Sequence, residues 1–286
     1  MTATNGAATG KKSKAKKPSR KAVHIAAPKM KSRRKARQIT TEFHRLTSEL
    51  DAVKKDNTIN RDEKTRRIAE LNAQIDAIGG RSAYQDASIL STSFHKTSKW
   101  VFQLLTKMER RPKSKEAPLR TLEVGAINTQ LLSCPWLNVR AIDLNSKHEK
   151  IEQCDFFSLV PAGEYDVLVS SMVINCVPDA PSRGKMLQLS FQHLRPGGLF
   201  FLMLPLLCLR NSMYMTYSRF VAILEAVGFQ VRETKESPKV AFFCLERPVD
   251  SAEATGAPSK SFPQQFVHSS DDPKKLKKRN RFSVIL

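Results

Sequence analysis

The chain has 286 residues and a formal net charge of +21, and its hydrophobic fraction of 41% is enough to build a sizeable core. The charge is concentrated at the ends. Residues 1–38 hold thirteen Lys and Arg and no acid, whereas residues 119–249 hold thirteen bases against twelve acids. We therefore predict that residues 1–38 form a disordered basic tail that favours a polyanionic partner, with RNA or DNA first. A nuclear-import signal or a solubilising tail is the alternative.

The cysteine and histidine pattern argues against metal sites and disulfides. The five cysteines form no CxxC pair, and the six histidines form no HExxH motif. We predict no metal and a reduced, intracellular protein. No N-terminal apolar stretch resembles a signal peptide, and the longest apolar run, residues 199–209, is too short to cross a bilayer. We therefore expect no membrane association.

Residues 39–118 have the pattern of a helical extension. Apolar residues recur at spacings of three and four in two runs, which the polar break Asp56-Asn57-Thr58 separates. Two such helices are too short to be stable alone, so we expect an antiparallel hairpin over 39–78 that ends at Gly79-Gly80. A dimerising coiled coil is the alternative. A further helix with one apolar face is predicted at 95–109.

From residue 119 the pattern changes to alternating strands and helices, which predicts a parallel sheet over residues 119–249. The predicted strands are 119–124, 138–143, 151–154, 165–171, 199–205, 229–234 and 240–246. The predicted helices are 128–133, 182–194 and 216–227. Only a few polar residues separate the last two strands, so these should pair antiparallel at the sheet edge. The expected fold class is α/β, a Rossmann-like sheet with helices on both faces. Residues 250–286 are predicted to be a disordered tail with the basic cluster 274–281.

Acidic residues end three successive predicted strands, where such sheets bind nucleotide-like ligands. Glu123 precedes Gly125, at which the chain must turn close to a ligand, and Asp143 is placed to accept both ribose hydroxyls of a cofactor. Asp155 is placed to accept from an adenine amino group, with Phe156 beside the ring. Each acid alone is more often a structural cap, so the joint pattern is what favours a cofactor site.

The loop after the first strand favours S-adenosylmethionine over a nicotinamide cofactor. The segment Gly125-Ala126-Ile127-Asn128 lacks the second and third glycines that close approach to a pyrophosphate requires. S-adenosylmethionine has no pyrophosphate, so their loss matters less for it. The terminal antiparallel pair of strands also favours a methyltransferase.

Six sequence blocks carry a resemblance to a known family. They are GGRSAYQDAS (79–88), LEVGAIN (122–128), IDLN (142–145), QCDFFSL (153–159), DVLVSSMVINCVPDAPSRGKMLQ (166–188) and LRPGGLFFLMLPLLCLRNS (194–212). Over about residues 79–247 the chain resembles the fungal family that methylates adenine-N1 of large-subunit (25S) ribosomal RNA.

The resemblance implies a class I methyltransferase fold and a nucleolar protein of ribosome biogenesis that acts on ribosomal RNA, within pre-ribosomal particles. The family's cofactor positions correspond to Gly125 and Asp143. A related animal branch resembles this domain but senses S-adenosylmethionine instead of transferring its methyl group. A catalytically inactive sensor or scaffold is therefore the alternative function.

Methylation at adenine N1 makes modest demands on the protein. N1 of neutral adenine carries a lone pair, so no residue has to act as a general base, and alignment and exclusion of water are the main requirements. Pairing hides N1, so the target base must be unpaired or flipped out. Ser171 and Asn175, which follow the fourth predicted strand, are candidates to orient the base. The alternative for Asn175 is that it caps local backbone.

Overall fold

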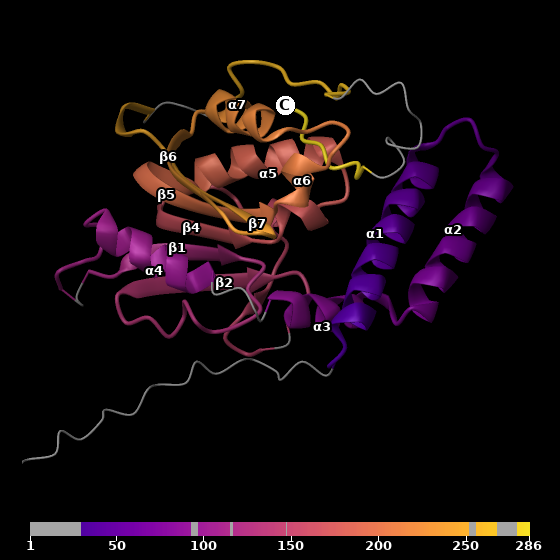
Figure 1. Cartoon of the computed structure of the whole chain (residues 1–286), viewed down its shortest axis with the longest axis horizontal. Coiled ribbons are helices and arrows are strands. Elements are labelled where there is room, and N and C mark those ends of the chain that lie inside the picture. The colour runs from indigo at the N-terminus through magenta and orange to yellow at the C-terminus, as the bar shows by residue number, and fades with distance from the viewer. Residues whose placement is uncertain (1–29, 93–96, 115–116, 147, 252–255, 268–278) are drawn as a thin grey trace, which may run out of the picture.

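The computed structural model describes residues 30–92, 97–114, 117–146, 148–251, 256–267 and 279–286. A helical region precedes a sheet with helices packed on it (Figure 1). The helices before the sheet are α1 (Arg33–Lys55), α2 (Arg61–Ala77), α3 (Gly80–Thr92) and α4 (Thr97–Lys107). None of the helices in these described ranges is long and apolar enough to span a membrane.

Seven strands form one sheet in the order β3-β2-β1-β4-β5-β7-β6. They are β1 (Leu119–Val124), β2 (Leu137–Asp143), β3 (Glu152–Gln153), β4 (Tyr165–Ser171), β5 (Leu194–Pro205), β6 (Gln230–Glu236) and β7 (Val240–Glu246). The strands from β1 to β5 pair in parallel, whereas β7 runs antiparallel to β5 and β6. The predicted α/β class and the terminal antiparallel pair are confirmed. The strand order reverses between β1 and β4, which is where open sheets of this kind bind ligands.

Helices cover both faces of the sheet, as predicted (Figure 1). On one face, Trp100 of α4 makes edge-to-face contacts with Phe201 and Phe242. The other face is covered by α5 (Ala180–His193), α6 (Leu207–Arg210) and α7 (Tyr217–Val227). The central part of β5, residues 199–204, is completely buried between the two layers. Burial of both faces is typical of parallel sheets, because crossover connections place helices on them.

The connection between β1 and β2 contains turns, so the predicted helix at 128–133 is wrong. Asn128 Oδ1 accepts a hydrogen bond from Gln130 N at 3.0 Å, a local turn that competes with helix formation. Pro135 follows at once, and six residues are too few to nucleate a helix without support. Leu131 instead joins the buried cluster under α4, which covers this part of the sheet.

α1 and α2 form the predicted hairpin (Figure 1). Its core contains Leu46, Leu50 and Val53 of α1 and Leu71 of α2. Asn60 caps α2, since its side chain accepts a hydrogen bond from Glu63 N at 2.8 Å. The hairpin packs on α3 rather than standing free, because α1 contacts α3 as extensively as it contacts α2.

The first helix starts earlier than predicted. α1 begins at Arg33, after a Ser32 side chain that accepts a hydrogen bond from Lys35 N. Ala36 is buried against Ala87 of α3, so this end of the helix is fixed by packing. The prediction of a disordered tail is therefore wrong for residues 33–38. Residues 1–29 lie outside the described residues.

The C-terminal segment is part of the fold, so the prediction of disorder over 250–286 is wrong for its described parts. Phe262, Phe282 and Val284 are buried in the same core as α5 and α7. A side chain at Gly184 of α5 would collide with Ile285 O, so the last residues lie directly on that helix. Apolar side chains scattered in a polar, Pro-containing stretch supply this packing. Of the predicted basic cluster, 274–278 lie outside the described residues.

Candidate active site

The predicted site residues gather at one end of the sheet, which we call the carboxyl edge because β1, β2 and β4 all finish there. Val124 of β1 lies opposite Ile142 of β2 and Ser170 of β4. Gly125 follows Val124 directly, and Asp143 ends β2. These two residues therefore sit side by side next to the reversal of strand order, where a ligand crevice is expected.

Two residues in the left-handed region shape the loops at this edge. Gly125 has a φ of +72°, and a Cβ there would collide with Val173 Cγ2, so the turn accepts only glycine. Met172, the first residue after β4, has a φ of +62°. Such a conformation costs a non-glycine residue on the order of 1–3 kcal/mol and is concentrated at functional sites. No sequence pattern predicts a positive φ at a methionine, so Met172 could not be identified as a site residue from the sequence.

Three buried polar atoms at the carboxyl edge lack a hydrogen-bond partner among the described residues. They are Glu123 Oε2, Ser170 Oγ and Asn175 Oδ1. Folded proteins leave few such atoms unpaired, so a group of them points to a ligand. Burial raises the pKa of the Glu123 carboxyl to about 8. A positively charged ligand group would restore its charged form, and S-adenosylmethionine carries both an ammonium and a sulfonium. The residues therefore fit this cofactor.

Asp143 is half-buried and held by its own loop. Its Oδ1 accepts a hydrogen bond from Asn145 N at 2.8 Å. Burial raises the pKa of the Asp143 carboxyl, and the Asn145 N–H and the positive charge of Arg81 oppose that rise. A carboxylate can accept more than one donor per oxygen, so ribose hydroxyls can be added to this arrangement. Leu144, which was not predicted as a site residue, leaves 54% of its surface exposed beside it and offers an apolar contact.

The third predicted pair, Asp155 and Phe156, has a local structural role. Asp155 is exposed, and its Oδ1 accepts a hydrogen bond from Phe157 N at 3.0 Å. Phe156 is only 4% exposed and packs in the core against Phe157 and His193. The structure does not bring its ring out into the crevice, so a contact of either residue with adenine stays a prediction.

The loop after β4 holds the residues predicted to orient the base. Ser171 ends β4 half-buried, and Asn175 Nδ2 donates a hydrogen bond to Cys176 Sγ at 3.3 Å. Its Oδ1 stays unpaired, so the alternative that Asn175 caps backbone finds no support in its described contacts. Tyr84 of α3 reaches this loop, with its hydroxyl 2.8 Å from Cys176 Sγ and its ring stacked on Phe43 at 4.4 Å. Only the block 79–88 of the resemblance could have signalled this contribution.

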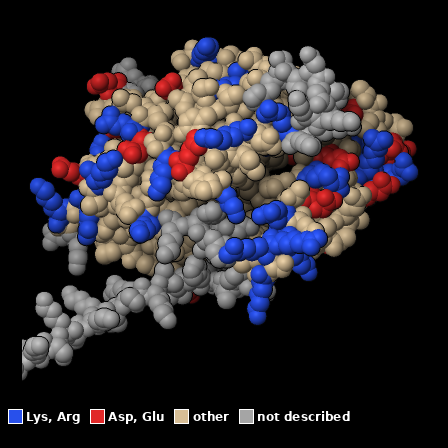
Figure 2. All heavy atoms as spheres, in the orientation of Figure 1, with Lys and Arg blue, Asp and Glu red and all other residues tan. Residues whose placement is uncertain are grey.

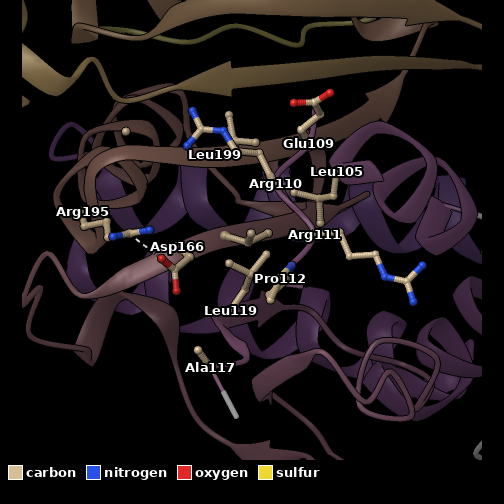
Figure 3. Close-up of a pocket in the computed structure, with 12 residues that line it drawn as sticks. Leu105, Glu109, Arg110, Arg111, Pro112, Ala117, Leu119, Asp166, Arg195 and Leu199 are labelled. Carbon is tan, nitrogen blue, oxygen red and sulfur yellow. Dashed lines mark ion pairs between the residues drawn. The ribbon is translucent and has the colours of Figure 1, made fainter. Parts of the chain in front are cut away.

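A cavity of about 310 Å³ lies at the opposite end of the sheet, which we call the amino edge. Figure 3 shows it between the end of α4 and the starts of β1, β4 and β5. Three of its charged lining residues form ion pairs, Arg195 with Asp166 and Arg110 with Glu246, and Arg111 lies over the ring of Trp136. No set of three His, Cys, Asp or Glu side chains within the described ranges could hold a metal ion. The amino-edge cavity lies at the opposite end of the strands from the candidate site.

Positive charge gathers where α1 begins. Five exposed residues there are basic, namely Lys31, Arg33, Arg34, Lys35 and Arg37. Figure 2 shows Lys and Arg side chains over this end of the helix, next to a hollow between the hairpin and the sheet domain. Because Ala36 packs on α3 and α3 contacts the loops after β2 and β4, this basic end lies near the carboxyl edge.

The strand order, with a reversal between β1 and β4 and with β7 antiparallel to both of its neighbours, defines a class I methyltransferase fold. The sequence matches the family described as 25S rRNA (adenine(2142)-N(1))-methyltransferase, Bmt2, over residues 69–284. The chain therefore belongs to this family, and the resemblance stated above is confirmed. The match extends to residue 284, in agreement with the packing of the C-terminal segment.

Two curated relatives support the assignment. The chain is 30% identical to the 25S rRNA (adenine(2142)-N(1))-methyltransferase of Saccharomyces cerevisiae over 182 residues, 60% of this chain and 52% of that protein. It is 32% identical to the 25S rRNA adenine-N(1) methyltransferase of Schizosaccharomyces pombe over 134 residues, 44% of this chain and 49% of that protein. The chain thus spans about half the length of the curated relatives it matches.

Among solved structures, the chain is similar to a Burkholderia thailandensis 1,6-didemethyltoxoflavin-N1-methyltransferase. The TM-score is 0.45 and the identity 16%, and the match covers 58% of this chain and 84% of that one. The fold assignment rests on the strand order rather than on this likeness.

Proposed function

We propose that the protein is an S-adenosylmethionine-dependent methyltransferase that modifies N1 of an adenine in large-subunit (25S) ribosomal RNA. One observation carries the proposal: unpaired buried polar atoms gather at the carboxyl edge of a chain that belongs to the 25S rRNA methyltransferase family. The activity stated in the names of the two yeast relatives supports the choice of base and of RNA.

The cofactor would be held by residues of β1 and β2. Gly125 leaves room for it at the turn, Asp143 accepts its ribose hydroxyls, and Glu123 pairs with its cationic methionyl end. When bound, S-adenosylmethionine supplies the methyl group from its sulfonium. The protein would position the cofactor, because each of these contacts would fix one part of the flexible S-adenosylmethionine molecule.

The substrate adenine would enter from the loop after β4. Its N1 lone pair is the nucleophile in neutral adenine, so no side chain has to remove a proton before reaction. Asn175 Oδ1 has no described partner and would accept a hydrogen bond from the exocyclic amino group of the adenine. Ser171, at the end of β4, is the second residue that we propose to orient the base. Orientation of the base and exclusion of water are the main protein contributions. The adenine must be unpaired or flipped out to reach this loop.

RNA binding would use the basic end of the molecule. Residues 1–29 contain eight Lys and Arg and no acid, and the exposed bases between Lys31 and Arg37 continue this charge up to α3. Positive charge of this density attracts phosphates and speeds association. We propose that pre-ribosomal particles carry the substrate, and that the protein works in the nucleolus during ribosome biogenesis, where this RNA is assembled.

Methyl transfer is tested by incubating the full chain with methyl-labelled S-adenosylmethionine and 25S rRNA that lacks the modification. Nucleoside analysis of the digested RNA should recover the label as N1-methyladenosine. The Asp143→Ala variant, assayed alongside at a cofactor concentration below the dissociation constant, should give label reduced about tenfold or more. Label in another nucleoside would refute the N1 assignment.

The sensor alternative predicts a different combination of results. A sensor would bind S-adenosylmethionine with normal affinity, transfer no methyl group to any RNA, and bind a protein partner in a cofactor-dependent manner. That combination would overturn the enzyme assignment while leaving the cofactor site intact.

A further inference from the structure

Apart from the contact of Tyr84 with Cys176, the block GGRSAYQDAS, residues 79–88, has no role in the site described so far. It folds as the turn into α3 and the first half of that helix. Gly79 and Gly80 have φ values of +92° and +60°, which turn the chain sharply out of α2. Figure 1 shows that α3 lies beside the ends of the strands rather than on a face of the sheet. A helix at this place is in a position to contact the loops that follow the strands.

α3 contacts two site loops that are far away in the sequence. Tyr84 reaches the loop after β4 through Cys176, across 92 residues of chain. Gln85 reaches the loop after β2 through Asn145, across 60 residues. Two neighbouring side chains of one helix therefore bridge the substrate loop and the ribose loop.

The contact between Gln85 and Asn145 is reciprocal. Gln85 Nε2 donates to Asn145 O at 2.7 Å, and Asn145 Nδ2 donates to Gln85 Oε1 at 3.2 Å. Asn145 N in turn donates to Asp143 Oδ1 at 2.8 Å. The three residues form a hydrogen-bonded chain that begins on α3 and ends on the carboxylate assigned to the ribose.

We propose that Gln85 is a positioning residue that fixes the Asp143 loop in its cofactor-binding conformation. This inference rests on the proposed function, because it assumes that Asp143 binds the ribose of S-adenosylmethionine. A loop of short side chains outside the sheet has several accessible conformations, and affinity falls in proportion to the fraction that is binding-competent. The two hydrogen bonds between Gln85 and Asn145 raise that fraction before the cofactor binds. Arg81, one turn earlier on α3, adds favourable positive charge near the same carboxylate.

The test is a double-mutant cycle on the full chain, with the dissociation constant of S-adenosylmethionine measured by calorimetry. Gln85→Met keeps the length of the side chain and removes both hydrogen bonds, so it should weaken binding about tenfold. Gln103→Met, at an exposed position of α4, is the matched control and should change nothing. Thermal unfolding of each variant checks that the fold is retained. Gln85→Glu, which keeps the acceptor but loses the donor, should also weaken binding.

Coupling to Asp143 distinguishes positioning from a general structural role. In an Asp143→Ala background, Gln85→Met should have no further effect on affinity, because the group that it positions is absent. Full additivity of the two substitutions would overturn the proposal, as would an unchanged affinity of the single Gln85→Met variant. If Asp143→Ala itself leaves affinity unchanged, the ribose assignment within the proposed function fails, and the positioning proposal fails with it.

Discussion

The two edges of the sheet carry charged and polar groups in contrasting states. At the amino edge, Arg195 pairs with Asp166 and Arg120 pairs with Glu164, so opposite charges neutralise each other. At the carboxyl edge, the buried Glu123 Oε2 has no partner within the described chain. A cavity of about 310 Å³ opens at the amino edge, where both buried ring nitrogens of His193 also lack a partner among the described residues. The carboxyl edge has three such unpaired oxygen atoms, one of them on a carboxyl group.

This contrast is why we assign the candidate site from unpaired buried oxygen atoms rather than from open volume. A buried carboxylate without a partner costs several kcal/mol if it stays charged, and a fold retains it only where something compensates. The ion pairs beside the amino-edge cavity, Arg195 with Asp166 and Arg110 with Glu246, need no ligand to neutralise their charges. Three unpaired oxygen atoms beside the strand reversal, together with the positive φ of Met172, therefore favour a ligand at the carboxyl edge.

The largest effect is expected for Gly125→Arg, which fills the turn at the carboxyl edge. A Cβ alone would collide with Val173, and the long side chain would occupy the space of the cofactor. Affinity for S-adenosylmethionine should fall by more than about a hundredfold, measured by calorimetry. The matched control is Gly163→Arg, which precedes β4 at the amino edge. Gly163 has a φ of +62°, but a Cβ there has ordinary contacts, so its variant should bind normally. Normal binding by the folded Gly125 variant would show that the crevice is misplaced.

Asp143→Ala should weaken S-adenosylmethionine binding about tenfold or more. The substitution removes a charged acceptor from the ribose hydroxyls, which is worth about 1.5–3 kcal/mol. Asp166→Ala at the amino edge is the control, because it removes an acid of the same type that is paired with Arg195. Calorimetry should show unchanged affinity for that variant. Equal losses for the two variants would mean that the edges do not differ in function.

Glu123→Gln should change the pH dependence of stability rather than the fold. The pKa of Glu123 is about 8 in the folded chain against 4.5 for the free side chain. Between these pH values, Glu123 is therefore protonated in the folded state and ionised in the unfolded state. Stability then falls as pH rises across that window, and Gln cannot ionise. Denaturant unfolding of ligand-free protein should show a stability advantage for Gln that grows from about pH 5 to about pH 8, by up to about 1.4 kcal/mol per unit.

Glu152→Gln is the control for this titration. Its hydrogen bonds from Arg140 lower the pKa of Glu152, so it is ionised throughout the same window. Any stability difference for that variant should stay constant between about pH 5 and about pH 8. A constant difference for Glu123→Gln as well would contradict the buried, unpaired state of its carboxyl group.

The sequence predicted the features that depend on local pattern. Strand periodicity located every strand of the sheet, and the meeting of parallel strand ends brought Gly125 and Asp143 together as expected. The part played by Tyr84 and Gln85 was out of reach, because their partners lie 92 and 60 residues away and no local pattern encodes such pairs.

Packing across long separations explains the other failures. Phe282 and Val284 join a core built a hundred residues earlier, and Arg183 NH1 donates to Ser283 O at 2.9 Å to hold them there. Composition alone favoured disorder for this Ser- and Pro-containing stretch. The helix predicted at 128–133 is wrong because its short apolar pattern belongs to a turn instead. Leu131 of that turn packs in the buried cluster under α4.

Substitutions in the basic tail should have the smallest effect on cofactor affinity and the largest effect on RNA affinity. Replacing its eight Lys and Arg within residues 1–29 by Gln keeps the length and leaves α1 intact, whereas a cut at residue 38 would remove Ala36 from its packing on α3. RNA affinity should fall and its salt dependence should flatten by about 0.7–0.9 per lost phosphate contact. The dissociation constant of S-adenosylmethionine should not change, since the carboxyl edge is untouched. Filter binding across a salt series measures the RNA affinity and its salt dependence, and calorimetry measures the dissociation constant of S-adenosylmethionine. An unchanged salt slope would mean that the tail acts as an import signal only. The folded part of the chain would then have to bind the RNA, and the exposed basic residues of α1 would be the first candidates.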